Sequence, residues 1–198
     1  KNNSVNEKII EFTVGDDRLN DLYLIKYDVK ASISHAKMLY RSNLLSEIEC
    51  NKIINILNEI LSQAEAGELK IEKEFEDMHS KIEYILTDKL GDIGKKIHTA
   101  RSRNDQVLVS IQLYLIDELN FIKAEVKSLF DLLINLAKKN KNIIMPGYTH
   151  MRAAMPSSFG LWFSAYAEIL IDDVISLNST IEIINQNTLG SAAGYGTS

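Results

Sequence analysis

The amino-acid sequence predicts an all-α fold, and three observations lead to that prediction. First, apolar residues recur every three or four positions along two long stretches, 102–140 and 163–184, as they do on the buried side of a helix. Second, the two prolines, Pro146 and Pro156, lie close together, so proline interrupts the chain nowhere else. Third, no segment alternates apolar and polar residues over a convincing strand length.

Turn and capping residues place the expected helices of the first half. Residues 1–28 are the least regular part of the chain, and a helix is expected over about 28–40. Ser46 and Glu49 have the spacing of a capping box, in which the hydroxyl and the carboxylate satisfy the first free N–H groups of a helix. The helix that begins there is expected to end at Gly67, because glycine is favoured just past a helix C-terminus.

The second half is expected to contain two much longer helices, preceded by a helix over about 72–90. Ser102 and Asp105 give a second capping signal, and no glycine or proline interrupts the chain from there to about Asn140. Such a helix is about 55 Å long at 1.5 Å per residue. A similar apolar stripe resumes over 163–184. Because a small globule cannot cover apolar stripes of this length, we expect oligomerisation.

Composition and charge exclude several classes of protein. The 198 residues are 45% hydrophobic and 25% charged, which are globular averages and exclude a disordered or low-complexity chain. The net charge of −5, without a basic tract, argues against partners such as nucleic acid or an anionic membrane. No apolar run is long enough to span a membrane, and the single Cys50 cannot form an internal disulfide, so a cytoplasmic location is expected. The start at Lys1 and the glycine-rich end suggest a segment of a longer protein.

Three polar clusters are candidate functional sites. His79 is either a helix-surface histidine paired with a carboxylate or a catalytic group. The run 98–106 places two arginines at the start of the longest helix, where it either binds an anion or forms a cap with salt bridges. Thr149 and His150 put a hydroxyl beside an imidazole, which combines a hydrogen-bonding group with a proton carrier. Three such clusters favour an active site at helix ends. The histidines and the cysteine do not have the spacing of metal ligands, so no metal site is expected.

These clusters resemble motifs of argininosuccinate lyases, which belong to the fumarase/aspartase superfamily. The run H-T-A-R-S-R-N-D-Q at 98–106 resembles the family's H-T-(G/A)-R-S-R-N-D-Q, and P-G-Y-T-H at 146–150 resembles a second family motif. E-D-M-H at 76–79 and L-G-S-A-A-G at 189–194 resemble two further segments. The similarity extends over essentially the whole chain, with the motifs in the family's order.

The resemblance implies a fold, a reaction and a set of site residues. The fold would be an N-terminal helical domain over 1–100 and the first long helices of a central bundle over 101–198, with a C-terminal domain absent, in a homotetramer. The reaction would be the reversible β-elimination of argininosuccinate to arginine and fumarate, a step of arginine biosynthesis without a metal or organic cofactor. His150 would be the catalytic residue, as the base or as the group that polarises it. The substrate-binding residues would be Ser32, His79, Arg103, Asn104 and Thr149.

The sequence departs from the family pattern at a few positions near this site. Arg152 replaces a usual glutamine, Met155 replaces a usual polar residue, and Ala31 and Ala100 stand where glycine is usual. The family's mobile loop with the catalytic serine would lie downstream of this chain, so the segment alone is expected to be inactive. Two other interpretations stay open. One is another lyase of the superfamily, against which the arginine-rich run argues, and the other is a non-catalytic, crystallin-like homologue.

Overall fold

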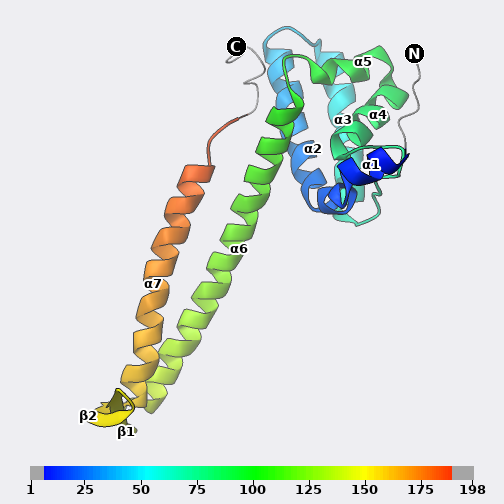
Figure 1. Cartoon of the computed structure of the whole chain (residues 1–198). Coiled ribbons are helices and arrows are strands. Elements are labelled where there is room, and N and C mark those ends of the chain that lie inside the picture. Colours follow the sequence, from blue (N-terminus) through cyan, green and yellow to red (C-terminus); the bar gives the residue numbers. More distant parts are fainter. Residues whose placement is uncertain (1–6, 189–198) are drawn as a thin grey trace. The chain divides into compact units, whose positions relative to one another are not determined.

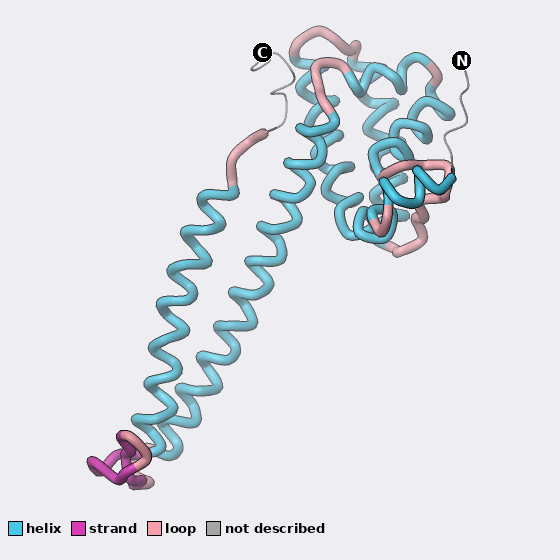
Figure 2. The backbone as a smooth tube through the Cα atoms, in the orientation of Figure 1, coloured by secondary structure: helices cyan, strands magenta, loops and turns pink. Residues whose placement is uncertain are grey.

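The computed structural model describes residues 7–188 and divides them into two compact units. The first unit contains the residues up to 114 and the described residues from 187 on, and the second contains residues 115–186. Regular structure in the described chain is helical except for one two-stranded hairpin, which confirms the predicted all-α class (Figure 2). The predicted turn at 189–194 lies outside the described residues.

The first unit is a small helical domain that contains α2, α3 and α4 (Figure 1). Its elements are α1 (Glu7–Val14), α2 (Asp17–Arg41), α3 (Glu47–Glu65), α4 (Met78–Leu90), α5 (Asp92–Lys95) and the short 3-10 helix η1 (Lys96–His98). Buried apolar side chains of α2, α3 and α4 form one continuous core. Leu39, Ile53 and Leu57 are completely buried in this core. A large part of the described core therefore comes from α2 and α3.

The predicted ends of α3 are confirmed. The Glu49 backbone N–H donates to Ser46 Oγ at 3.3 Å, and the Ser46 N–H donates to Glu49 Oε2 at 2.9 Å, so both halves of the capping box are formed. Gly67 follows the helix with φ of +70°, a left-handed conformation that glycine adopts without steric cost.

The predicted starts of two other helices are wrong. α2 begins at Asp17 rather than near residue 28, because Ile25 packs in the core and extends the buried face of the helix toward the N-terminus. α4 begins at Met78 rather than near residue 72, because the Asp77 carboxylate accepts the Ser80 N–H at 2.7 Å and caps the helix there. The side chain that starts α4 is thus a residue of the candidate site.

Two long helices are the main elements of the second unit, as predicted. α6 (Arg103–Asn140) begins in the first unit and continues into the second, and α7 (Phe159–Ile184) lies beside its second part (Figure 1). Lys123 Nζ donates to Asn178 Oδ1 at 2.7 Å between them. A Cβ at Gly160 would lie 2.6 Å from the Cα atom of Lys141, so the absence of a side chain permits this close approach.

A short hairpin connects α6 to α7, and the sequence did not predict it. β1 (Ile144–Thr149) and β2 (Arg152–Ser158) pair in antiparallel register, with Thr149 opposite Arg152. Most residues of the hairpin are exposed, so the pattern of alternating apolar and polar residues that marks a half-buried strand is absent. The two prolines lie opposite each other in this register.

The described part of the second unit has almost no core of its own. Its buried hydrophobic residues are Ala137 and Ala167, both small. The large hydrophobic side chains that it exposes include Leu115, Phe121, Ile122, Leu129, Leu132, Ile169, Ile171 and Ile175. Exposed apolar surface of this extent is typical of an interface.

No helix within residues 7–188 combines the length and the apolar character that a membrane crossing requires.

Candidate active site

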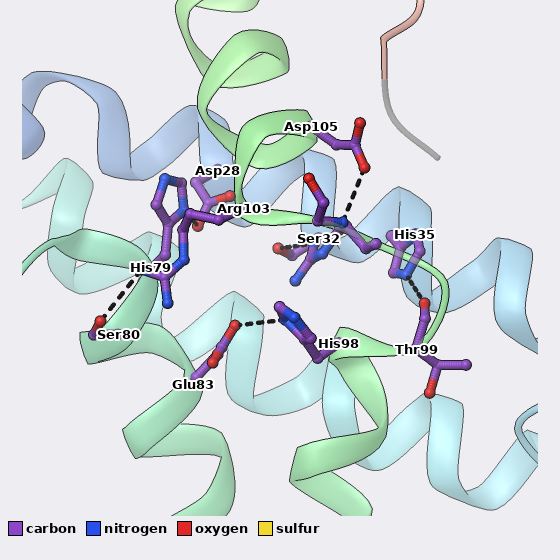
Figure 3. Close-up of polar contacts among 12 residues, drawn as sticks. Asp28, Ser32, His35, His79, Ser80, Glu83, His98, Thr99, Arg103 and Asp105 are labelled. Carbon is purple, nitrogen blue, oxygen red and sulfur yellow. Dashed lines mark hydrogen bonds and ion pairs between the residues drawn. The ribbon is translucent and has the colours of Figure 1, made fainter. Parts of the chain in front are cut away.

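One face of α2 carries three buried polar residues at helical spacing. Asp28, Ser32 and His35 are 0%, 0% and 1% exposed, and their spacing of four and three residues places them on one side of the helix. Buried polar groups are costly unless they find partners, so three in succession mark a surface that contacts other polar elements. Figure 3 shows these residues and the polar contacts around them.

Asp28 contacts the start of α4. Its Oδ2 atom lies 3.0 Å from His79 Nδ1, and the His79 side chain is only 2% exposed. This is an ion-pair distance, but neither atom meets the angular requirements of a hydrogen bond. The contact is therefore electrostatic, and in a neutral ring it favours the tautomer with the hydrogen on Nδ1.

Ser32 contacts Arg101, which precedes α6. Arg101 Nη1 donates to Ser32 Oγ at 2.9 Å, and Arg101 is 5% exposed. Burial lowers the pKa of the Arg101 guanidinium, and the charge of Asp28 is the largest influence that raises it. Because arginine stays protonated in proteins, this side chain holds a buried positive charge between α2 and α6.

His35 holds the segment that leads into Arg101. Its Nε2 atom lies 2.9 Å from the Thr99 carbonyl oxygen, and since a carbonyl only accepts, Nε2 carries the hydrogen. Burial and then the charge of Arg101 lower the pKa of His35 from 6.5 to about 4, so the ring is neutral at pH 7. The next residue in this segment, Ala100, has φ of +56°, a strained value for a residue with a side chain.

The N-terminus of α6 is both capped and salt-bridged. The Ser102 N–H donates to Asp105 Oδ2 at 2.9 Å, and the Asn104 N–H donates to Ser102 Oγ at 3.1 Å. Arg103 Nη1 pairs with Asp77 Oδ2 and lies 3.3 Å from Ser80 Oγ. The sequence left two possibilities open here, a cap with salt bridges or an anion-binding site. The cap is formed, and it leaves the Arg103 side chain 38% exposed.

Asp77 performs two tasks at this point. Burial raises the pKa of its carboxyl group, but the hydrogen bonds from Ser80 and the charge of Arg103 outweigh that effect and lower it. The side chain is thus ionised at neutral pH, caps α4 and fixes Arg103 over the end of that helix. The side chain of Arg103 is 38% exposed and Asn104 is exposed, so both are open to a ligand.

A second imidazole–carboxylate pair lies at the edge of this cluster. His98 Nδ1 is 3.0 Å from Glu83 Oε1, which connects η1 to α4. Both side chains are partly accessible, unlike the buried pair of His79 and Asp28.

The other predicted residues, Thr149 and His150, lie in the second unit at the hairpin turn, and both are exposed. His150 and Met151 form the two-residue loop, with φ of +48° and +63°. A two-residue hairpin loop with both φ values positive is favoured by asparagine and glycine, so histidine and methionine are strained here by about 1 kcal/mol or more each. Strain of this kind is concentrated at functional sites.

The structure therefore brings together four of the six predicted residues. The N-terminal group consists of Ser32, His79, Arg103 and Asn104, all in the first unit, whereas Thr149 and His150 belong to the second. The sequence analysis did not identify Asp28 and His35 as site residues. The pattern that could have revealed them is a polar residue at every third or fourth position of α2, on a face that is buried. Among residues 7–188 no group of three or more metal-ligating side chains is close enough to hold a metal ion.

Solved structures of several enzymes share this fold. The structure superposes on EDDS lyase in complex with formate with a TM-score of 0.80 and 22% identity, over 100% of this chain and 39% of that one. It superposes on class II fumarase from Schistosoma mansoni with a TM-score of 0.76 and 18% identity, over 97% and 42% of the two chains. At these identities the likeness defines the fold alone.

Sequence comparison then gives the family. A sequence profile of the lyase family matches residues 11–198, and the chain belongs to that family. It is 52% identical to argininosuccinate lyase from Phocaeicola vulgatus over 100% of this chain and 44% of the relative. It is 47% identical to argininosuccinate lyase from Thermotoga neapolitana over 99% and 49%. The resemblance seen in the sequence motifs is confirmed, and the chain spans less than half the length of these relatives.

Proposed function

We propose that the full-length protein is an argininosuccinate lyase, which cleaves argininosuccinate to arginine and fumarate by β-elimination. The observation that carries this proposal is the 52% identity to a curated argininosuccinate lyase along all 198 residues. Both polar regions that the reaction would use, the α6 N-terminus and the hairpin turn, lie within that span.

The chemistry explains why such residues are needed. A base removes a weakly acidic proton from the carbon beside a carboxylate, and the electron-rich intermediate is stabilised by cations and N–H donors. A second group protonates the guanidino nitrogen as it departs. Arg103 supplies positive charge, and Asn104 supplies an amide at the positive end of α6, so both suit a substrate carboxylate.

Ser32 and His79 differ from Arg103 and Asn104 in that their side chains are buried. The two side chains are 0% and 2% exposed, whereas Arg103 and Asn104 are open to a ligand. Their hydrogen-bonding groups are already oriented by Arg101 and Asp28.

Thr149 and His150 act from the hairpin turn. Thr149 holds a substrate carboxylate, and His150 is the base or polarises the base. The strained left-handed backbone at His150 supports a functional role, because asparagine or glycine would fit that position at a lower energy.

The proposal includes a homotetramer in the cytoplasm that needs no metal or organic cofactor. The exposed apolar side chains of the second unit support association with other copies or with further parts of the chain. The single thiol, Cys50, is buried and burial raises its pKa, which suits an unreactive cysteine in a reducing compartment.

The test measures fumarate release from argininosuccinate by the full-length protein and by His150→Asn. Asparagine tolerates the left-handed conformation, so the variant is expected to be at least as stable as the wild type while its kcat falls about 100-fold or more. Met151→Asn is the matched control, because it makes the same substitution at the neighbouring strained position and is expected to keep activity. Full activity in His150→Asn would remove this residue from the mechanism.

Two further outcomes bear on the proposal as a whole. A stable wild-type protein that releases no fumarate would contradict it and would favour a non-catalytic, crystallin-like homologue. The 198-residue segment alone is expected to show no turnover, and a normal rate from it would contradict the need for a downstream loop.

A further inference from the structure

Arg101 and Asp28 stand out because they are buried charges outside the set of proposed substrate-binding residues. The carboxylate of Asp28 is fully covered, and neither of its oxygens accepts a hydrogen bond within the described residues. The Nε atom of Arg101 likewise has no acceptor there, although Nη1 donates to Ser32. Asp28 lies one helical turn before Ser32 on the same face of α2, which places the two buried charges beside the same hydroxyl.

Stability alone is a poor explanation for these two buried opposite charges, which influence each other electrostatically but each contact a different residue. Replacing a buried ion pair with apolar residues of similar size is often neutral or stabilising, because the charges lose hydration on burial. Each charge here instead contacts a proposed substrate-binding residue, with Arg101 2.9 Å from Ser32 and Asp28 3.0 Å from His79.

The pair also fixes the direction in which these two residues can hydrogen-bond. A guanidinium group has only donors, so Ser32 Oγ accepts from Arg101 and its own hydrogen is left for another acceptor. In a neutral His79 ring, the Asp28 carboxylate 3.0 Å from Nδ1 favours the hydrogen on that nitrogen, and this tautomer leaves Nε2 as an acceptor.

We propose that Asp28 and Arg101 are positioning residues that set the hydrogen-bond polarity of the site, so that Ser32 donates to a substrate carboxylate and His79 accepts from a substrate N–H. The inference rests on the proposed lyase function, whose substrate carries both kinds of group. Arg101 has a further positioning effect, because it anchors the segment that leads directly into Arg103.

The test uses the full-length protein with Asp28→Asn, Arg101→Gln and the double variant. Each single variant leaves one buried charge without the opposite charge near it and is expected to lower the unfolding midpoint. The double variant removes both charges and is expected to recover most of that loss. Its KM for argininosuccinate is nevertheless expected to stay raised about tenfold or more, with kcat changed less than about threefold. The reason is that Ser32 and His79 are no longer oriented, so their hydrogen bonds to the substrate's charged groups are weakened. A double variant with wild-type KM would overturn the proposal.

Arg101→Lys keeps the charge and removes the planar fork, so it is expected to fold and still to raise KM. If the double variant does not fold, this variant decides the question, and a wild-type KM would count against positioning by Arg101. The matched control is the exposed pair Lys89–Glu59, at 2.5 Å, whose replacement by two glutamines removes the same charges and is expected to leave KM unchanged.

A readout without turnover separates this proposal from the lyase function. NMR of ¹⁵N-labelled histidine reports which ring nitrogen of His79 carries the hydrogen, with His79→Gln used to assign the signal. We expect Nδ1–H in the wild type and loss of that preference in the Asp28→Asn/Arg101→Gln variant. An Nε2–H tautomer in the wild type would overturn the polarity assignment even if fumarate is released. The expected tautomers in a protein that releases no fumarate would contradict only the lyase function.

Discussion

His35 is expected to make the stability of the protein depend on pH, and the size of the effect follows from its surroundings. Burial and the neighbouring Arg101 charge lower its pKa from 6.5 to about 4 in the folded protein, whereas the hydrogen bond to Thr99 and the charge of Asp105 oppose this change. A difference of this size corresponds to about 3 kcal/mol at 1.36 kcal/mol per pKa unit.

The sign follows from proton binding. Above pH 6.5 the ring is neutral in both states, so its effect on stability is constant. As the pH falls from 6.5 to 4, the unfolded chain binds a proton that the folded protein does not, and the free energy of unfolding decreases. The bond to Thr99 survives, because protonation occurs at Nδ1 and not at the Nε2–H group that donates.

The variant His35→Gln removes the titration and retains an amide N–H that can donate to Thr99. Urea unfolding at pH 7, 6, 5 and 4 gives the free energy of unfolding of the wild type and of the variant. Because all other titrating groups are the same in the two proteins, the difference between them reports on His35. We expect the wild type to lose about 3 kcal/mol more than the variant between pH 7 and pH 4. Parallel pH profiles for the two proteins would refute the assignment of His35 as a buried neutral histidine.

Two further substitutions test local backbone geometry. Ala100→Gly relieves a left-handed conformation at φ of +56°, and we expect urea unfolding to show a gain of about 0.5–1 kcal/mol, whereas a loss would mean that this segment is not strained. Gly94→Ala places a Cβ 2.2 Å from the Leu86 carbonyl oxygen, and we expect thermal unfolding to show a loss of about 2–3 kcal/mol. An unchanged midpoint would show that the backbone moves aside at little cost.

The long helices were predictable because a single strong pattern determines them. Both signals for α6 lie within the helix sequence itself. The capping residues Ser102 and Asp105 predict the start of α6, and the apolar spacing predicts its end near Asn140, as observed. The start of α2 was missed because the apolar residues that extend it interact with distant core residues. The hairpin was missed because most of its residues are exposed, so its sequence lacks the alternation of apolar and polar residues that marks a half-buried strand.

The candidate site was predictable only in part, for a similar reason. Arg103, Asn104, Thr149 and His150 lie in runs of polar residues that are unusual in themselves. The partners that orient these and other site residues come from elsewhere in the chain, as the contact between Arg101 and Ser32 illustrates. Such a pairing depends on the packing of α2 against the start of α6, which no local pattern specifies.

The charges of the first unit show why it cannot bind an anionic substrate by net positive charge alone. Two guanidinium groups lie in the cluster, at Arg101 and Arg103, and each has an acidic neighbour. The carboxylates that influence or contact these arginines are Asp28, Asp77, Glu83 and Asp105. With more acidic than basic groups present, carboxylate binding depends on directed donors, namely the exposed part of Arg103 and the N-terminal end of α6. The same acidic excess suits the proposed substrate, argininosuccinate, which also carries a guanidinium and an ammonium group. For the proposed elimination, we therefore expect the additional positive charge around the electron-rich intermediate to come from outside the first unit.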